Sequence, residues 1–209
     1  MKTKVTVVSK IISYYFVISI LSTNNAFSHE IEEQVLMLKN NEFSYRVDFT
    51  DPKEEMHWRA TNDGVMGGLS QGLLLFSGSA SIFSGVISTE NKGGFSSVYK
   101  DIQPLPERLH FIEIDVQGDG LIYQLRLVMY VNGYRLAYKH DFITTLGQRE
   151  RIKFKLSDFK ASFRGRHISG APKLKSEDIR ETGFLLSRQE AGKFSLTLYK
   201  LEIYSNSEA

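Results

Sequence analysis

The chain has 209 residues, a formal net charge of +2 at neutral pH and no cysteine. The absence of cysteine excludes disulfide bonds, thiolate zinc sites and a cysteine nucleophile. No block of like charges marks a tail or arm for a polyanion, so nucleic acid is not an expected partner.

The first 28 residues have the composition of an export signal. Three lysines give a basic start, residues 11–21 form an apolar run, and small residues at Ala26 and Ser28 suit a signal peptidase. The run is shorter than the ~20 residues that cross a bilayer. We therefore expect residues 1–28 to be a signal peptide, the protein to be periplasmic or secreted, and membrane contact to occur only during export. The alternative is a mitochondrial transit peptide, because the segment has no acidic residue, although it also lacks arginine.

The remainder of the chain predicts one all-β domain. Residues 29–42 are expected to be a loosely docked N-terminal segment, and from residue 43 to residue 205 the dominant hydrophobic period is two. This alternation is clearest in residues 110–116, 121–130, 151–156 and 194–198. Asn132-Gly133 is a strong hairpin signal, and only residues 176–180 suggest a helical turn. The pattern predicts a monomeric, single-domain jelly-roll β-sandwich with little helix.

Glycine is concentrated in one part of this domain. Half of the 16 glycines lie within 31 residues, at positions 64–94. A phosphate-binding loop would place such glycines between a strand and a helix. Strand-like runs follow them here, and no Gly-Lys-Ser/Thr sequence is present. The glycines therefore predict corners between strands and not a nucleotide site.

The glycine-rich segment WRATNDGVMGGLSQG, residues 58–72, resembles the signature of the CIA30 family, the complex I intermediate-associated protein 30 domain. Further blocks follow in family order at residues 83–91, 93–98, 118–123, 159–166, 183–184 and 192–196, so that the resemblance covers about residues 45–204. The motif residues expected to be mainly structural are Trp58, Asn62, Asp63, Gly64, Met66, Gly67, Gly68, Gly93, Gly94 and Phe95.

The resemblance implies a galactose-binding-like sandwich and a non-catalytic, chaperone-like binding or assembly factor for a protein complex. In mitochondria the family is associated with assembly of respiratory complex I, and it has no agreed catalytic residues to carry over. An exported member implies another client, or a role on the outer side of the membrane, because most complex I factors act on the matrix or cytoplasmic side. The alternative function is an envelope module that binds carbohydrate or polysaccharide. A hydrolase has little support, because no spacing selects a pair of carboxylates.

Two motif residues have specific expected roles. Trp58 is expected to pack against the core and to donate its indole N–H to a backbone carbonyl, with a stacking platform as the alternative. Asn62-Asp63-Gly64 is expected to form an Asx-type turn with Gly64 in a left-handed conformation. The alternative is that Asp63 ligates a structural calcium ion, which would require several converging oxygens.

The candidate ligand or partner residues are an arginine cluster and nearby tyrosines. Arginine forks bind carboxylates, phosphates and sugar hydroxyls, and tyrosine rings could line a face or rim of the sandwich. No catalytic residue, cofactor or histidine pair at metal-ligand spacing is expected. The candidates are Arg164, Arg166, Tyr123, Tyr134 and Tyr138.

Overall fold

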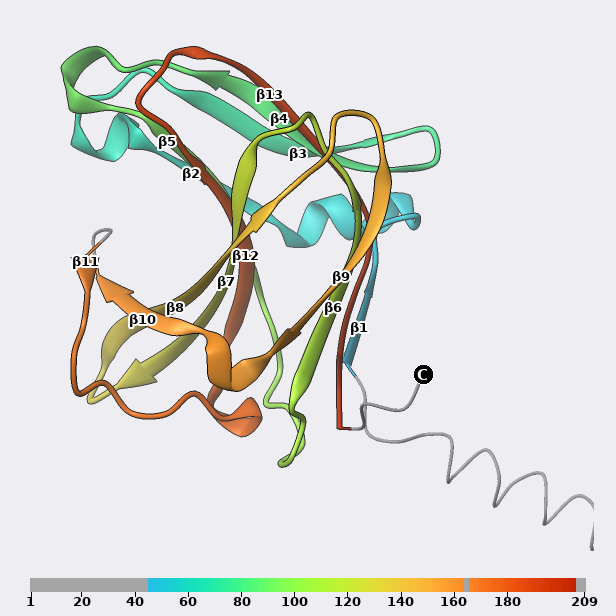
Figure 1. The fold of residues 1–209 in the computed structure, drawn as a ribbon, viewed down its shortest axis with the longest axis vertical. Coiled ribbons are helices and arrows are strands. Elements are labelled where there is room, and N and C mark those ends of the chain that lie inside the picture. Colours follow the sequence, from blue (N-terminus) through green and yellow to red (C-terminus); the bar gives the residue numbers. More distant parts are fainter. Residues whose placement is uncertain (1–44, 164–165, 206–209) are drawn as a thin grey trace, which may run out of the picture. The chain divides into compact units, whose positions relative to one another are not determined.

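The strands of the computed structural model form two facing antiparallel sheets (Figure 1). The structure describes residues 45–163 and 166–205, so the predicted signal peptide, the segment 29–42 and Arg164 lie outside the described residues. The first sheet contains β1 (Tyr45–Asp48), β3 (Gln71–Ser77), β4 (Ala80–Ile87), β6 (Phe111–Gln117), β9 (Arg149–Lys155) and β13 (Gly192–Tyr204). The second contains β2 (Arg59–Asn62), β5 (Phe95–Asp101), β7 (Ile122–Val131), β8 (Tyr134–Ile143), β10 (Lys160–Phe163), β11 (Arg166–His167) and β12 (Glu181–Ser187).

The order of the strands differs from their order in the chain. The first sheet runs β3-β4-β13-β6-β9, and β1 pairs with the later part of β13. The long strand β13 therefore contacts β4 and β1 on one side and β6 on the other, with a register shift near Tyr199. The second sheet runs β11-β10-β8-β7-β12-β5-β2. The predicted all-β sandwich is confirmed.

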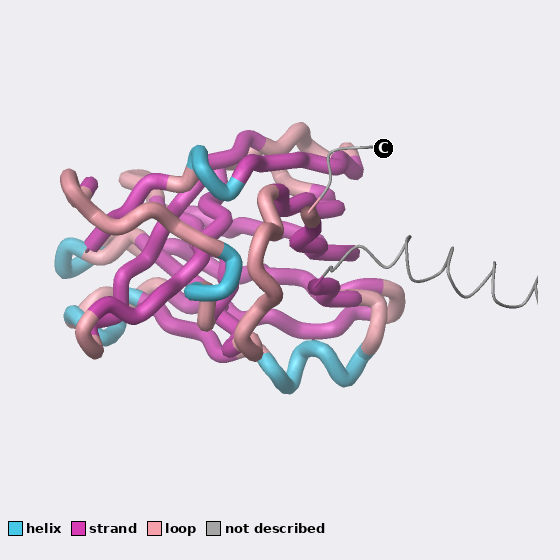
Figure 2. Tube along the Cα trace, turned by 90° about the horizontal axis from the view of Figure 1, so that it is seen from below, coloured by secondary structure: helices cyan, strands magenta, loops and turns pink. Residues whose placement is uncertain are grey.

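In the residues that the structure describes, helical structure is limited to short 3₁₀ turns in the connections between strands (Figure 2). In chain order the turns are η1 (Pro52–His57), η2 (Asp63–Met66), η3 (Glu90–Lys92), η4 (Leu156–Asp158) and η5 (Ser176–Asp178). The last of these is the helical turn that the sequence predicted. None of the helices in the described residues is long and apolar enough to cross a membrane.

The core lies between the sheets and follows the predicted alternation. In β7 the side chains of Tyr123, Leu125, Leu127 and Met129 are buried in one cluster. The β7–β8 turn is the predicted hairpin, with φ of +50° at Asn132 and +80° at the glycine that follows.

An aromatic group fills the core near η1. The ring of Trp58 is partly buried, and its centroid lies 5.3 Å from that of Phe49 and 6.0 Å from that of Phe184. Its indole N–H donates to Glu54 Oε1 at 2.9 Å and not to the predicted backbone carbonyl, because η1 places this carboxylate four residues before the ring. The structural role expected for Trp58 is otherwise as predicted.

Replacing Phe184 by alanine tests this aromatic group. We expect Phe184→Ala to lower the free energy of unfolding by about 4 kcal/mol, because a fully buried ring leaves a cavity. Chemical denaturation can be followed by the fluorescence of Trp58, the only tryptophan. The matched control is Leu185→Ala, a half-buried neighbour that points to the other side of β12. Equal losses for the two variants would contradict the assignment of the core.

Candidate functional site

The carboxylate of Asp63 holds the glycine-rich loop in place. Asp63 is fully buried at the start of η2. Its Oδ1 accepts from the Ser70 backbone N–H at 2.9 Å. Its Oδ2 accepts from the Ser70 hydroxyl at 2.5 Å and from the backbone N–H groups of Gly94 at 2.6 Å and Phe95 at 3.3 Å. One carboxylate thus joins this loop to backbone 31 residues further along the chain.

The glycines around Asp63 are required by close approach and by backbone conformation. A Cβ at Gly68 would lie 2.4 Å from the Asp63 carboxyl group, and a Cβ at Gly93 would lie 2.6 Å from Oδ2. Gly67 ends η2 with a φ of +89°, a left-handed conformation that costs other residues energy. These three motif glycines are therefore structural, as the sequence predicted.

Two expectations for this loop are wrong. Gly64 is not among the residues with positive φ, and the left-handed residue is Gly67. Asp63 makes long-range hydrogen bonds and not a local Asx turn, because the chain brings the N–H groups of Ser70 and Gly94 to its oxygens. Asn62 is also structural, since its side chain donates to Gly72 O at 3.2 Å.

The calcium alternative at Asp63 has no geometric support. Both carboxylate oxygens already accept from N–H or O–H groups, and the backbone N–H groups cannot be ligands of a cation. In the described ranges, no group of three or more His, Asp or Glu side chains is arranged to hold a metal ion.

The hydrogen bonds at Asp63 also determine its charge state. Burial by itself raises the pKa of the Asp63 carboxyl group, because it penalises the charged form. Hydrogen bonds from Ser70, Gly94 and Phe95 outweigh burial, so the pKa lies below its ordinary value. Asp63 is therefore ionised at neutral pH, and its charge strengthens the hydrogen bonds that hold the loop.

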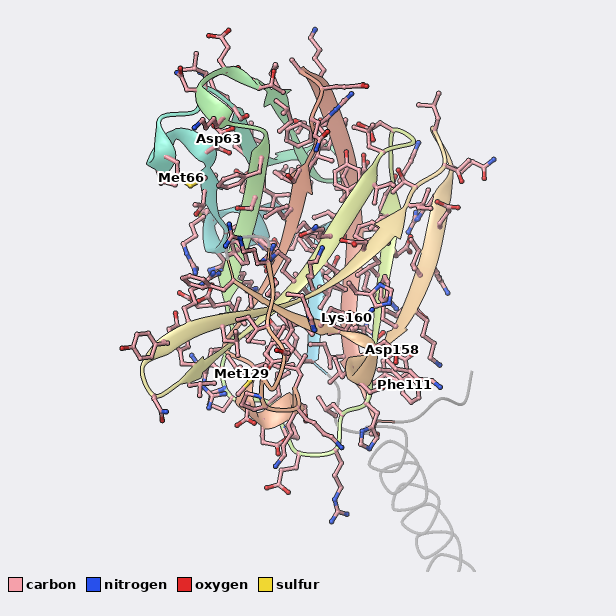
Figure 3. The ribbon with its side chains drawn as sticks, turned by 60° about the vertical axis from the view of Figure 1, so that its left-hand side comes forward. Asp63, Met66, Phe111, Met129, Asp158 and Lys160 are labelled. Carbon is pink, nitrogen blue, oxygen red and sulfur yellow. The ribbon has the colours of Figure 1, made fainter. Side chains whose placement is uncertain are left out.

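While its backbone is held from inside, the loop presents apolar side chains to solvent. The residues Val65, Met66 and Leu69 are 74%, 63% and 55% exposed. Figure 3 shows Met66 beside Asp63 at one end of the sandwich. Met66 is expected from the sequence to be mainly structural, and its side chain lies outside the buried core.

Exposed apolar side chains continue onto the edge of the first sheet. Leu73 and Leu75 are exposed on β3, which is the terminal strand of that sheet, and Val86 is exposed on the neighbouring β4. The register pairs Gln71 with Val86, so Leu73 and Val86 are diagonal neighbours on one face. We call Val65, Met66, Leu69, Leu73, Leu75 and Val86 the apolar edge.

The outer face of the second sheet carries a cluster of charges. Glu181 of β12 is almost fully buried there, and its Oε1 accepts from the Tyr130 hydroxyl at 2.8 Å. Its other oxygen accepts from Arg135 at 2.8 Å and pairs with Arg59. Burial raises the pKa of Glu181, but these hydrogen bonds and charges lower it further than burial raises it. The carboxylate therefore stays ionised at neutral pH, and the positive charges of Arg135 and Arg59 balance its negative charge.

The ring of Tyr99 lies beneath this cluster. A Cβ at Gly183 would lie 2.4 Å from Tyr99 Cδ1, so the glycine allows the ring to lie against β12. The Arg135 guanidinium is centred 4.6 Å from the centroid of that ring. Tyr99, Val128 and Ala137 form a small buried apolar cluster below the charged side chains.

The structure does not bring together the predicted ligand residues that it describes. Tyr123 is in the core, with its hydroxyl 3.0 Å from Asp119 Oδ1, and Tyr138 is also buried, with its hydroxyl donating to Pro172 O. Their rings therefore offer no face to a ligand, and burial raises the pKa of both hydroxyls. Tyr134 is exposed at the β7–β8 turn and Arg166 is exposed in β11.

Sequence reasoning missed Arg59, Arg135 and Glu181. The alternation within residues 121–130 puts Arg126 on the face away from the core, and the same rule applied to β12 puts Glu181 there. The register that brings strands β2, β8 and β12 to one place could not be read from the sequence.

The fold and these sites define a β-sandwich with two candidate binding surfaces, the apolar edge and the outer face of the second sheet. Residues 47–198 match the family model described as Complex I intermediate-associated protein 30 (CIA30). The match covers most of the chain, and the protein belongs to the CIA30 family.

Solved structures with this fold include carbohydrate-binding modules. The family 11 module of the cellulosomal cellulase Lic26A-Cel5E of Clostridium thermocellum has a TM-score of 0.56 at 12% identity, covering 79% of this chain and 96% of the module. A family 11 module from the same organism, in complex with a β-1,3-1,4-mixed-linked tetrasaccharide, has a TM-score of 0.55 at 13% identity, covering 80% and 99%. An exo-β-agarase has a TM-score of 0.50 at 10% identity, covering 79% of this chain and 26% of the agarase. At such identities the likeness shows the jelly-roll fold alone. A search of curated protein sequences gave no match.

Replacing Asp63 by asparagine tests the anchor of the loop. We expect Asp63→Asn to lower the free energy of unfolding at pH 7 by about 3 kcal/mol, because one acceptor is lost and buried N–H groups lose their partner. The folded pKa lies below the unfolded value of about 3.9, so this stabilisation is present above that pH and is lost as the pH falls through the folded pKa.

The pH dependence gives a second readout of the same variant. Denaturation measured from neutral to acidic pH should show a smaller loss of stability in acid for Asp63→Asn than for the parent. The control is Asp158→Asn, an exposed acid in η4, which should follow the parent. An Asp63→Asn protein as stable as the parent at pH 7 would show that the loop does not depend on the carboxylate.

Proposed function

We propose that the protein is a non-catalytic assembly factor that holds a protein partner through the apolar edge. The observation that carries this proposal is the exposure of Val65, Met66 and Leu69 on a loop fixed by Asp63. Exposed apolar groups that adjoin one another are typical of protein–protein contact sites. Burying each such side chain against a partner contributes at most about 1.5–3 kcal/mol to the free energy of binding. A backbone that is already fixed loses less conformational entropy on binding.

The buried carboxylates support a role without catalysis. A general acid needs a carboxyl group with a raised pKa. The pKa values of Asp63, Asp115 and Glu181 are all lowered, and each carboxylate is held by hydrogen bonds or arginines. These groups are thus suited to holding structure at neutral pH and not to donating protons.

The family description directs the first search for a partner. It names complex I intermediates, so subunits of that complex are the first proteins to test. The predicted signal peptide favours a client outside the cytoplasm, and we propose an envelope complex as the alternative client. Determining the mature N-terminus and the cell fraction that contains the protein separates the two.

Charged substitutions in the loop test the proposal. We expect Met66→Asp with Leu69→Asp to weaken partner binding at least tenfold, because an interface core excludes unpaired charge. The melting temperature should stay within a few degrees of the parent, because both side chains are exposed. The matched control is Ile143→Asp, which is 70% exposed at the end of β8.

The measurement is photo-cross-linking in cells from position 66 and, in parallel, from position 143. The cross-linked partner is then identified and purified, and its affinity for the parent and for each variant is measured. A protein joined specifically from position 66, with affinity lost in the double variant alone, supports the proposal. Equal binding by the double variant and the parent would rule out the apolar edge as the contact surface.

A second candidate function is glycan binding on the outer face of the second sheet. It is favoured by the density of hydrogen-bonding side chains on that face, including Gln124, Arg126 and Asp141. It also draws on the fold likeness to a module whose structure contains a bound tetrasaccharide. On this candidate, affinity would depend on the sheet face and would be unchanged by substitutions at Met66 and Leu69.

A further inference from the structure

The side chain of Arg126 in β7 is an unusual feature of the outer face of the second sheet. Arg126 is only 8% exposed, yet no ion pair joins it to a carboxylate among the described residues. Its Nη1 donates to Gln124 Oε1 at 3.0 Å and its Nη2 to Ser162 Oγ at 3.3 Å. Its buried Nε–H has no acceptor in the described part of the chain. Buried arginines are normally paired with an acid, because an uncompensated charge is costly.

The position of Ser162 shows how the guanidinium lies. Ser162 belongs to β10, which is separated from β7 by β8. Arg126 therefore extends across β8, at the point where Ala137 supplies only a methyl group. A guanidinium has five N–H donors, and two of them are used. The unused donors match an acceptor such as a carboxylate.

The strand register places two further cations next to Arg126. Arg126 pairs with Lys139 of β8, and Lys139 pairs with Lys160 of β10, so three cations from three adjacent strands form one row. Lys139 lies 3.4 Å from Asp141, and Lys160 has no ion-pair partner among the described residues. Lys160 is labelled in Figure 3, on a part of the sheet away from the Asp63 loop.

Positive charge continues beyond Lys160. This lysine also lines a pocket of about 830 Å³. The charged side chains of that pocket are Arg108, Lys155, Lys160, Lys173 and Lys175, with Glu107 and Glu177. The excess of cations attracts an anion to this side of the molecule and raises its rate of arrival.

The neighbouring row indicates what else the ligand carries. Asp141 and Gln124 are paired in register, two residues along the strands from Lys139 and Arg126, a separation of about 7 Å. A carboxylate beside the cations would repel a uniformly acidic peptide. It would accept hydrogen bonds from hydroxyl groups, and Gln124 could both donate and accept. A ligand that alternates acid groups with hydroxyls fits both rows.

We infer that the outer face of the second sheet binds an acidic saccharide, whose carboxylate is received by Arg126, Lys139 and Lys160. This inference rests on the second candidate function and narrows its ligand from glycans in general to uronic-acid oligomers. It is independent of the apolar edge, which lies on the other sheet and on the Asp63 loop.

The test is titration calorimetry of the full chain with three probes of equal length. The probes are an oligogalacturonate, a neutral galacto-oligosaccharide and an oligoglutamate. We expect the oligogalacturonate to bind best, with an affinity that falls as salt is added. Arg126→Gln should weaken binding about 30-fold, and Lys139→Gln and Lys160→Gln about fivefold each. The matched control Lys193→Gln, an exposed lysine in β13, should bind like the parent.

The surface variants Lys139→Gln and Lys160→Gln keep the test valid if Arg126→Gln does not fold. Stronger binding of the neutral oligomer would overturn the acidic assignment while leaving glycan binding in place. If neither saccharide binds, both the acidic assignment and the second candidate function, glycan binding, are overturned. Oligoglutamate binding as tightly as the oligogalacturonate would assign the face to acidic peptides, and unchanged affinity in a folded Arg126→Gln protein would remove the arginine from the site.

Discussion

The hydrogen bonding of the Asp63 carboxylate is the constraint on which the glycine-rich loop depends. The carboxylate is a buried charge, and such a charge is stable only where several hydrogen-bond donors converge on it. Ser70 supplies two of the donors, and Gly94 and Phe95 supply the others at the start of β5. The glycine spacing of the family motif follows from this, because Gly68 and Gly93 lie against the carboxylate where a Cβ would collide. Part of the motif therefore consists of residues whose backbone must approach this one carboxylate.

This constraint explains how a structural motif can keep apolar side chains in solvent. Loops with exposed apolar side chains tend to fold back and bury them, since burial is favourable. The anchored backbone prevents this for Val65 and Met66, whose neighbours on both sides are fixed. The second sheet differs, because its outer face carries charged side chains. There Arg135 and Arg59 pair with Glu181, and Arg126 has no carboxylate partner among the described residues. The two surfaces therefore differ in chemistry, since one is apolar and the other is charged.

Much of the fold could be predicted from the sequence, because burial on one face of a strand imposes a period of two. Residues 110–116, 121–130 and 151–156 correspond to β6, β7 and β9 for this reason. The same rule puts Tyr123 of β7 on the apolar face, where its hydroxyl donates to Asp119 and does not face a ligand. The roles of Asp63 and Arg126 could not be predicted in this way. Their partners come from distant strands, and register between strands is set by the whole packed domain and not by local pattern.

The place of β13 in the first sheet has a consequence for biogenesis. This strand borders β4, β1 and β6, yet it is the last strand in the described part of the chain. β1 has no sheet partner, and β6 has only β9, until the chain has been made through Tyr204. Long-range pairings of this kind form slowly, since distant segments must meet before any contact is gained. During synthesis the first sheet therefore cannot close until its last strand has been made.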